Sequence, residues 1–401
     1  MLKSVIVVHH HEITLKGNNR KYFESRLLKN LQIVLKGYPE VERIFGGYGR
    51  FVIELSTDLQ IEQICKDLSC VFGLSNICAG LRIDQDIEIF KTISERLLQP
   101  MKISSLKVDS RRSDKRFPLK SMEINSVVGA HLCNRFQVRA DMTNPDVTIY
   151  IEIADGNAFI YLAKSQGIGG LPIGVSGRVV SLLSAGFDSP VASWRMMKRG
   201  ASVIFVHFHS IPYTSQNSLD QVIQLVRVLT KYQYKSKLYF VPFADVQNEI
   251  VLHSPPPLRI ILYRRMMIRI AEIVARREKA EALVTGEAVG QVASQTLRNI
   301  RVIDEAATFP ILRPLSGMDK EETMDLARKI GTFEISNEPF DDCCSFLAPR
   351  SPETWAKLEQ VQDAELKFDI ETLVRDTVKK ISIEEFDYLD QIKEKASDFS
   401  S

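Results

Sequence analysis

The sequence has few cysteines, and its amino terminus has no apolar run of the length that a membrane span or a secretion signal needs. Only six of its 401 residues are cysteine, and two of these are adjacent. A secreted disulfide framework is therefore excluded, and a reducing compartment is expected. The amino terminus has only four apolar residues in a row before a run of histidines, too few for a signal-peptide core. We expect a cytoplasmic protein that does not enter membranes.

The chain also has almost no net charge, with a formal value of +2 at pH 7, but its charges are unevenly distributed. Between Lys102 and Arg139, nine Lys and Arg residues stand against three acids. From Glu353 to the end, acids are in excess. A basic middle segment in a nearly neutral chain indicates a surface for nucleic acid on one part of the molecule.

A length of 401 residues predicts more than one hydrophobic core. The first part alternates short strands with helices and predicts two α+β units, over residues 1–59 and over residues 60–165, the second with a sheet of its own. A glycine-rich stretch over residues 166–177 is the predicted linker. Residues 178–401 repeat strand and helix, which predicts an α/β domain with a doubly wound parallel sheet and a helical tail. Ligands of such sheets bind at the carboxyl ends of the strands.

The most informative segment joins a buried strand over residues 179–183 to a helix that we expect to have Pro190 in its first turn. The loop between them is Ser184-Ala-Gly-Phe-Asp-Ser189. Backbone amides at a helix start carry partial positive charge, and small side chains let a phosphate approach them closely. The order Ser-x-Gly-x-Asp-Ser resembles the PP-loop of ATP pyrophosphatases, which cleave ATP to AMP and pyrophosphate. The alternatives are a turn without nucleotide and, for Asp188, a simple helix cap.

Further segments, in order from the first residues to about residue 355, resemble the tRNA 4-thiouridine synthetases. Residues 12–17 and 19–23 resemble the ferredoxin-like amino-terminal domain of that family, and residues 111–120 resemble its THUMP domain, an RNA-binding module. The remaining matches lie at residues 169–174, 206–209, 212–214, 285–296, 313–315, 317–321 and 341–344. The resemblance therefore implies a ferredoxin-like domain, a THUMP domain and a PP-loop domain in this order.

The family's activity implies that the chain adenylates the uridine at position eight of tRNA and replaces its C4 oxygen by sulfur, giving 4-thiouridine. The sulfur would come from a persulfide delivered by a cysteine desulfurase, and ATP and Mg²⁺ would be the cofactors. Asp188 is placed to orient the Mg²⁺. Cys344 is favoured as the persulfide or disulfide-forming thiol, with Cys343 beside it; the alternative is a structural pair.

Two sets of binding residues follow from the same resemblance. The implied ATP-binding residues are Leu182, Leu183, Ser184, Ala185, Gly186, Phe187, Ser189, His207, Phe208, Arg264, Gly286 and Gln295. The implied tRNA-binding residues are Arg111, Arg112, Lys115, Arg116 and Lys120, which would contact phosphates without reading sequence. Alternatives remain: a solvated charge for Arg264, an ordinary turn glycine for Gly286 and a solvated face for the basic cluster.

The sequence departs from the family pattern at several points. The run His9-His10-His11 stands where the family has Arg-Tyr-Gly, and Ala185 stands where PP-loops often have glycine, which would cost about 1 kcal/mol if that position needs a positive φ. The rhodanese domain of some members is absent, so the sulfur carrier is expected elsewhere in this chain or in another protein. With only two cysteines in the catalytic half, an iron–sulfur cluster is not expected.

Some functions remain open at this stage. Members of the family also pass sulfur into thiamine thiazole synthesis, a secondary role associated with the missing rhodanese domain. The oligomeric state is undetermined, with a homodimer as one option. The competing functions are a small-molecule PP-loop amidase or synthetase, similar to argininosuccinate or GMP synthetase, and a non-catalytic tRNA-binding protein. The basic segment favours tRNA over the small-molecule substrates.

Overall fold

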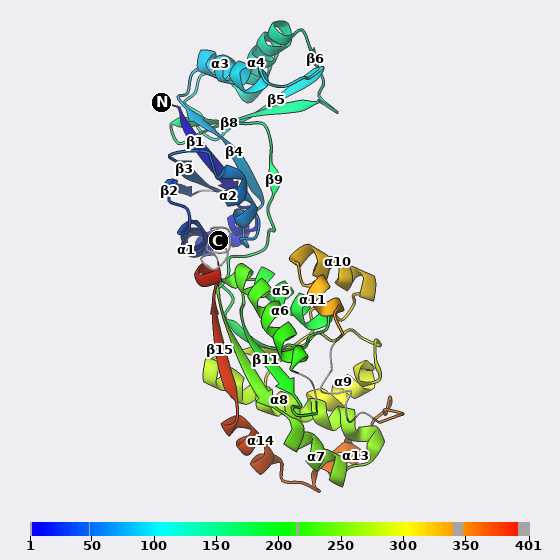
Figure 1. The fold of residues 1–401 in the computed structure, drawn as a ribbon. Coiled ribbons are helices and arrows are strands. Elements are labelled where there is room, and N and C mark those ends of the chain that lie inside the picture. Colours follow the sequence, from blue (N-terminus) through cyan, green and yellow to red (C-terminus); the bar gives the residue numbers. More distant parts are fainter. Residues whose placement is uncertain (1, 48, 214–215, 340–346, 348, 392–401) are drawn as a thin grey trace. The chain divides into compact units, whose positions relative to one another are not determined.

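The computed structural model describes residues 2–47, 49–213, 216–339, 347 and 349–391. The chain divides into two compact units, residues 1–172 and residues 173–401 (Figure 1). No helix in the described part is long and apolar enough to cross a lipid bilayer.

The first unit is built on one mixed sheet with helices beside it. Its strands are β1 (Lys3–His9), β2 (Val41–Gly47), β3 (Arg50–Leu55), β4 (Asn76–Ile83), β5 (Ser105–Arg112), β6 (Arg139–Ala140), β7 (Val147–Ala154), β8 (Asn157–Tyr161) and β9 (Ser165–Gln166). Its helices are α1 (Arg20–Leu35), α2 (Ile61–Leu68), α3 (Ile87–Leu98) and α4 (Ser121–Phe136), with a 3₁₀ segment η1 (Glu12–Asn19). Over the described residues, the strand order is β2-β3-β1-β4-β8-β7-β5-β6, and β9 pairs with β4.

The prediction of a separate sheet in the second α+β part was wrong, because β4 joins the two parts. This strand pairs antiparallel with β1 along Lys3–His9 and, on its other edge, with β8 through Leu81–Ile83. Gly80 interrupts the apolar pattern of β4, and a glycine inside a strand reads as a breaker. Here it permits a close approach instead, since a Cβ atom at Gly80 would lie 2.2 Å from the Ile160 carbonyl oxygen.

The second unit is the predicted parallel sheet with helices packed on it. Its strands are β10 (Arg178–Leu182), β11 (Ser202–His209), β12 (Lys235–Pro242), β13 (Ala282–Val284), β14 (Ile311–Leu312) and β15 (Ser382–Asp387). Its helices are α5 (Asp188–Lys198), α6 (Asn217–Gln233), α7 (Ala244–His253), α8 (Arg259–Glu278), α9 (Leu297–Asp304), α10 (Lys320–Ile330), α11 (Phe333–Asn337), α13 (Leu358–Glu365) and α14 (Ile370–Lys379), with 3₁₀ segments η2 (Pro256–Leu258) and η3 (Ala293–Gln295).

The order of these strands creates a place for a ligand. The sheet runs β14-β13-β10-β11-β12-β15, so the chain moves outward from β10 to β12 and then returns to the other side of β10 at β13. This reversal is the topological switch point at which doubly wound sheets bind ligands. The middle six residues of β11 are all buried, as expected for a parallel strand covered on both faces. Helix α8 contributes Leu262, Tyr263 and Met266 to the main hydrophobic core of this unit.

The predicted helical tail contains two helices, α13 and α14, but then adds the strand β15. This strand pairs antiparallel with β12 at the edge of the sheet. Acidic residues of β15 face basic ones on β12: Lys237 pairs with Glu385 at 3.4 Å, and Lys235 pairs with Asp387 at 3.1 Å. Cross-strand pairs of opposite charge favour this register, which the sequence pattern of the tail alone does not specify.

Candidate nucleotide site and candidate RNA surface

The loop of residues 184–189 is closed by its own serines. Ser189 lies in the first turn of α5, and its Oγ accepts a hydrogen bond of 2.8 Å from the Ser184 backbone N–H. The two hydroxyls of Ser184 and Ser189 are also 3.1 Å apart. The loop is therefore held in one conformation between β10 and α5, with the backbone N–H groups of a helix start beside it.

Asp188 is not the cap of this helix. The helix begins at Asp188, the residue before it occupies the cap position, and no side chain bonds to the free N–H groups there. Instead, Asp188 Oδ2 accepts a hydrogen bond of 3.2 Å from Gln291 Nε2. Burial raises the pKa of Asp188, while Gln291 and the charge of Lys320 act in the opposite direction. The structure therefore excludes the helix-cap alternative for Asp188, whose carboxylate contacts Gln291 instead.

The structure bears on two small residues near the loop, Ala185 with its possible backbone strain and Gly286 as a possible ordinary turn glycine. Neither Ala185 nor Gly186 is among the described residues with positive φ, so the strain considered for Ala185 does not arise. Gly286 follows β13 at a point of very close packing, because a Cβ atom there would lie 2.6 Å from the Ser189 backbone nitrogen. Gly286 is therefore more than an ordinary turn glycine: its lack of a side chain lets the end of β13 touch the phosphate loop.

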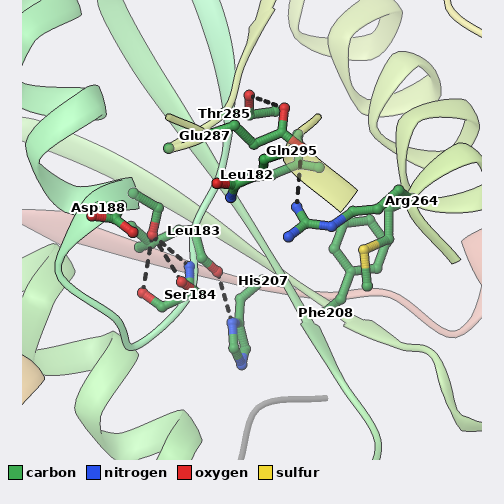
Figure 2. Close-up of a pocket in the computed structure, with 13 residues that line it drawn as sticks. Leu182, Leu183, Ser184, Asp188, His207, Phe208, Arg264, Thr285, Glu287 and Gln295 are labelled. Carbon is green, nitrogen blue, oxygen red and sulfur yellow. Dashed lines mark hydrogen bonds and ion pairs between the residues drawn. The ribbon is translucent and has the colours of Figure 1, made fainter. Parts of the chain in front are cut away.

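One pocket at the carboxyl ends of β10, β11 and β13 gathers most of the predicted nucleotide residues (Figure 2). Those that line it are Leu182, Leu183, Ser184, Ser189, His207, Phe208, Arg264, Gly286 and Gln295, together with Asp188. Ala185, Gly186 and Phe187 do not line it. Ala185 is buried, and the Phe187 ring packs against the Phe333 ring with 5.2 Å between centroids. His207 fixes the strand ends, since its Nδ1–H donates to the Leu183 carbonyl over 2.8 Å.

Glu287 is a pocket residue that sequence reasoning missed, along with Met267 and Thr285. Its carboxylate is almost fully buried and lies 2.7 Å from Arg313 Nε and 3.7 Å from Arg264 Nη1. The Thr285 hydroxyl also donates to it over 2.9 Å. Burial alone would raise the pKa of Glu287, but the two arginines and the hydrogen bonds outweigh it and hold the pKa below its usual range.

This network settles the alternative for Arg264, which is a pocket residue oriented by an acid rather than a solvated charge. A possible signal in the sequence was the acid placed directly after Gly286 at a strand end. The carboxylates of the pocket lining are those of Asp188 and Glu287. Because Glu287 is held by arginines, Asp188 is the lining carboxylate that suits a divalent cation.

The predicted RNA-binding cluster lies in the first unit, at the end of β5 and in the loop that follows it. Arg111, Lys115, Arg116 and Lys120 are exposed. Arg112 differs from them, because its guanidinium donates to the Leu119 carbonyl over 2.8 Å and also to the Phe117 carbonyl. The guanidinium of Arg116 is paired with Asp114 at 2.8 Å. Arg112 therefore shapes the loop, whereas Arg111, Lys115 and Lys120 are exposed and have no ion-pair partner within the part of the chain that the structure describes.

The cysteine prediction cannot be placed, since Cys343 and Cys344 lie outside the described residues. The four cysteines that the structure describes, Cys65, Cys70, Cys78 and Cys133, are all in the first unit and form no disulfide with one another. Burial raises the pKa of Cys65 to about 11 and that of Cys78 to about 12. These two thiols are therefore not thiolates near neutral pH.

Comparison with known proteins gives matches along nearly the whole chain. The family described as thiamine biosynthesis protein (ThiI) matches residues 174–370, its ferredoxin-like domain matches residues 5–78, and the THUMP domain matches residues 87–163. A probable tRNA sulfurtransferase of Thermoanaerobacter sp. (strain X514) is 43% identical over 375 residues, which cover 93% of this chain and 97% of that protein. Another from Moorella thermoacetica is 41% identical over 379 residues, covering 94% and 96%.

A solved structure is similar over the same extent. The crystal structure of a 4-thiouridine synthetase–RNA complex with bound ATP has a TM-score of 0.87 and 34% sequence identity to this chain. The match covers 96% of this chain and 100% of the other.

Proposed function

The chain belongs to the tRNA sulfurtransferase family, whose ThiI-type, ferredoxin-like and THUMP domains it carries, and we propose that it binds ATP in the pocket beside Asp188 to make 4-thiouridine in tRNA. The observation that carries the proposal is the meeting of the loop 184–189 with Gly286 at the switch point of the sheet. Family membership removes the small-molecule synthetase and the non-catalytic binding protein from consideration.

The pocket suits the triphosphate of ATP at one end and its adenosine at the other. The phosphates would lie against the start of α5, where backbone N–H groups and small side chains accept an anion. The adenosine would lie against the apolar side chains of Leu182 and Phe208, at the ends of neighbouring strands. Arg264, oriented by Glu287, supplies a positive charge on the side of the pocket opposite the loop (Figure 2).

The chemistry requires activation, because the C4 oxygen of a uracil is a poor leaving group. The oxygen would attack the α-phosphorus of ATP, pyrophosphate would leave, and a sulfur nucleophile would then displace AMP from C4. Asp188 would hold Mg²⁺, which neutralises charge on the phosphates when it is bound. The role of the protein groups is to place the reacting atoms in line and to balance the charge that develops.

A cysteine desulfurase would load Cys344 with a persulfide, whose outer sulfur would attack C4 and displace AMP. A second thiol, for which Cys343 is the candidate, would then break the S–S bond to Cys344, releasing 4-thiouridine and leaving a disulfide that an external thiol reduces. The test is 4-thiouridine formed and pyrophosphate released from tRNA and ATP by the wild type, Cys343→Ser and Cys344→Ser. We expect Cys344→Ser to stop desulfurase-driven product while pyrophosphate release persists, because adenylation of the uridine precedes the step that needs sulfur. Full desulfurase-driven activity in the double variant would contradict the relay. Absence of product with the wild type would contradict the function itself.

The tRNA would bind to the exposed charges of residues 111–120. Replacing Arg112 would change both the loop conformation and its charge, because its guanidinium bonds to loop carbonyls. We therefore base the prediction on Arg111→Ala combined with Lys115→Ala. This pair should weaken binding of different tRNAs equally and reduce the slope of log affinity against log salt by about two. The slope is measured by anisotropy titration between low and moderate salt.

A matched control is Arg96→Ala. This exposed residue on α3 follows Glu95, which contacts His131 near the opposite end of α4 from the loop. The control should leave the slope unchanged. An unchanged slope in the double variant would remove the cluster from the RNA surface. Sulfur transfer into thiamine thiazole synthesis and assembly as a homodimer stay predictions.

A further inference from the structure

An exposed tryptophan stands close to the pocket on a well-anchored segment. The side chain of Trp355 is 69% exposed, which is unusual for the largest apolar side chain. Its backbone N–H donates to Glu353 Oε1 over 2.8 Å. Asn299, on α9, donates to the Glu353 carbonyl over 2.7 Å and accepts from the Ala356 N–H over 3.0 Å. These hydrogen bonds fix the backbone on both sides of Trp355, so the exposed indole ring has a defined position on the surface.

A guanidinium accompanies this ring. The Arg298 guanidinium carbon lies 5.7 Å from the centroid of the Trp355 ring, and its Nε donates to the Ala356 carbonyl over 3.1 Å. Within the part of the chain that the structure describes, neither Arg298 nor the exposed Arg301, one turn further along α9, has an acidic partner at ion-pair distance. The described surface therefore combines an exposed aromatic ring with two arginines that have no acid at ion-pair distance.

This surface borders the nucleotide pocket. Gln295 lines the pocket, and the next residue, Thr296, donates to the Thr354 carbonyl over 2.9 Å. In the same loop, Gln291 contacts Asp188. Leu297, at the start of α9, is 70% exposed and extends the apolar surface. A base bound on Trp355 would thus lie close to the pocket in which we propose that the uridine is activated.

We propose that Trp355 and Arg298 form a stacking platform for an unpaired base of the tRNA next to the uridine that is modified. A base must leave its stack to reach a buried active site, and its neighbours then lose stacking contacts. Proteins receive such bases on aromatic rings and arginine planes, and a positive surface follows the backbone. A protein partner fits less well, since its apolar surface would bury two arginines without acids. The inference rests on tRNA being the substrate.

The chain offers a built-in probe for this contact. It contains two tryptophans, and Trp194 is only 2% exposed, so a neutral quencher such as acrylamide acts mainly on Trp355. We expect saturating tRNA to lower the emission of Trp355 and to protect it from acrylamide. The variant Trp355→Phe, which should show little quenching in either state, assigns the signal. Unchanged quenching with tRNA bound would overturn the proposal, and so would protection by the cysteine desulfurase but not by tRNA.

Kinetics supply a second readout. Trp355→Ala should raise the KM for tRNA by about 5- to 150-fold, the range for loss of one base–aromatic stack, and leave the KM for ATP unchanged. Trp355→Phe should restore most of the affinity. Leu366→Ala is the matched control and should change neither constant, because Leu366 is an apolar residue after α13 that is 85% exposed. An unchanged KM for tRNA in Trp355→Ala would overturn the platform alone, whereas failure of the wild type to bind tRNA would overturn the proposed function as well.

Discussion

Asp188→Asn is expected to lower 4-thiouridine formation by a factor of at least about 100 while tRNA affinity stays within about twofold. The substitution keeps the size of the side chain and its ability to accept from Gln291, and removes only the negative charge. Loss of one preorganised electrostatic group in an active site costs about 10²- to 10³-fold in kcat. The basic cluster of residues 111–120 lies in the other compact unit, and Trp355 and Arg298 are not among the described residues that line the pocket, so the proposed RNA contacts should be unaffected.

The measurement is single-turnover thiolation together with tRNA binding by anisotropy. Asp369→Asn is the matched control, because Asp369 caps α14 through the Thr372 N–H and does not line the pocket. Equal loss of thiolation and of tRNA binding would contradict a role of Asp188 that is separate from tRNA binding.

Glu287→Gln should be the most destabilising single polar substitution in the pocket. It leaves Arg313 and Arg264 without their shared buried carboxylate, and removal of one partner from a buried ion pair costs about 3–5 kcal/mol. For a unit of this size, that free energy corresponds to a fall in Tm of roughly 6–20 °C. Calorimetry would measure it, with Glu281→Gln as the control, since Glu281 is exposed in the same stretch of chain. A fall no larger than that of the control would contradict the prediction.

The lowered pKa of Glu287 predicts how the unfolding free energy depends on pH. Burial opposes the charge of Glu287, yet the two arginines lower its pKa below the usual value of 4.5. A group with a lowered folded-state pKa stabilises the protein above its unfolded pKa and loses that contribution as the pH falls through the folded one. The difference in unfolding free energy between wild type and Glu287→Gln should therefore be constant near neutral pH and shrink below about pH 4.5. A difference that grew on acidification would contradict this sign.

The phosphate loop could be predicted because everything that forms it is close in sequence. A buried strand, a run of small residues and a helix start follow one another within residues 178–198, and the hydrogen bonds between Ser184 and Ser189 span five residues. The resemblance implied Gly286 as an ATP-binding residue. Which backbone approaches it could not be read from the sequence, because Ser189 lies almost a hundred residues away.

The strands β4 and β15 were missed for a different reason. Each has a sequence that argues locally against a strand, Gly80 in β4 and the acids in β15, and each is stabilised by partners far along the chain. Gly80 meets the Ile160 carbonyl, and Glu385 meets Lys237. Propensity is a weak preference that such contacts override.

The sequence by itself determined the family, the order of the domains' motifs and the position of the phosphate loop, because these depend on residue types at short spacings and on apolar periodicity. Only the tertiary structure decided which charges are compensated. It placed Glu287 between two arginines, turned Arg112 into a loop contact and left Arg298 beside an exposed Trp355 without an acid among the described residues. The physical reason is that ion pairs and stacking act over a few ångströms between residues that can be far apart along the chain.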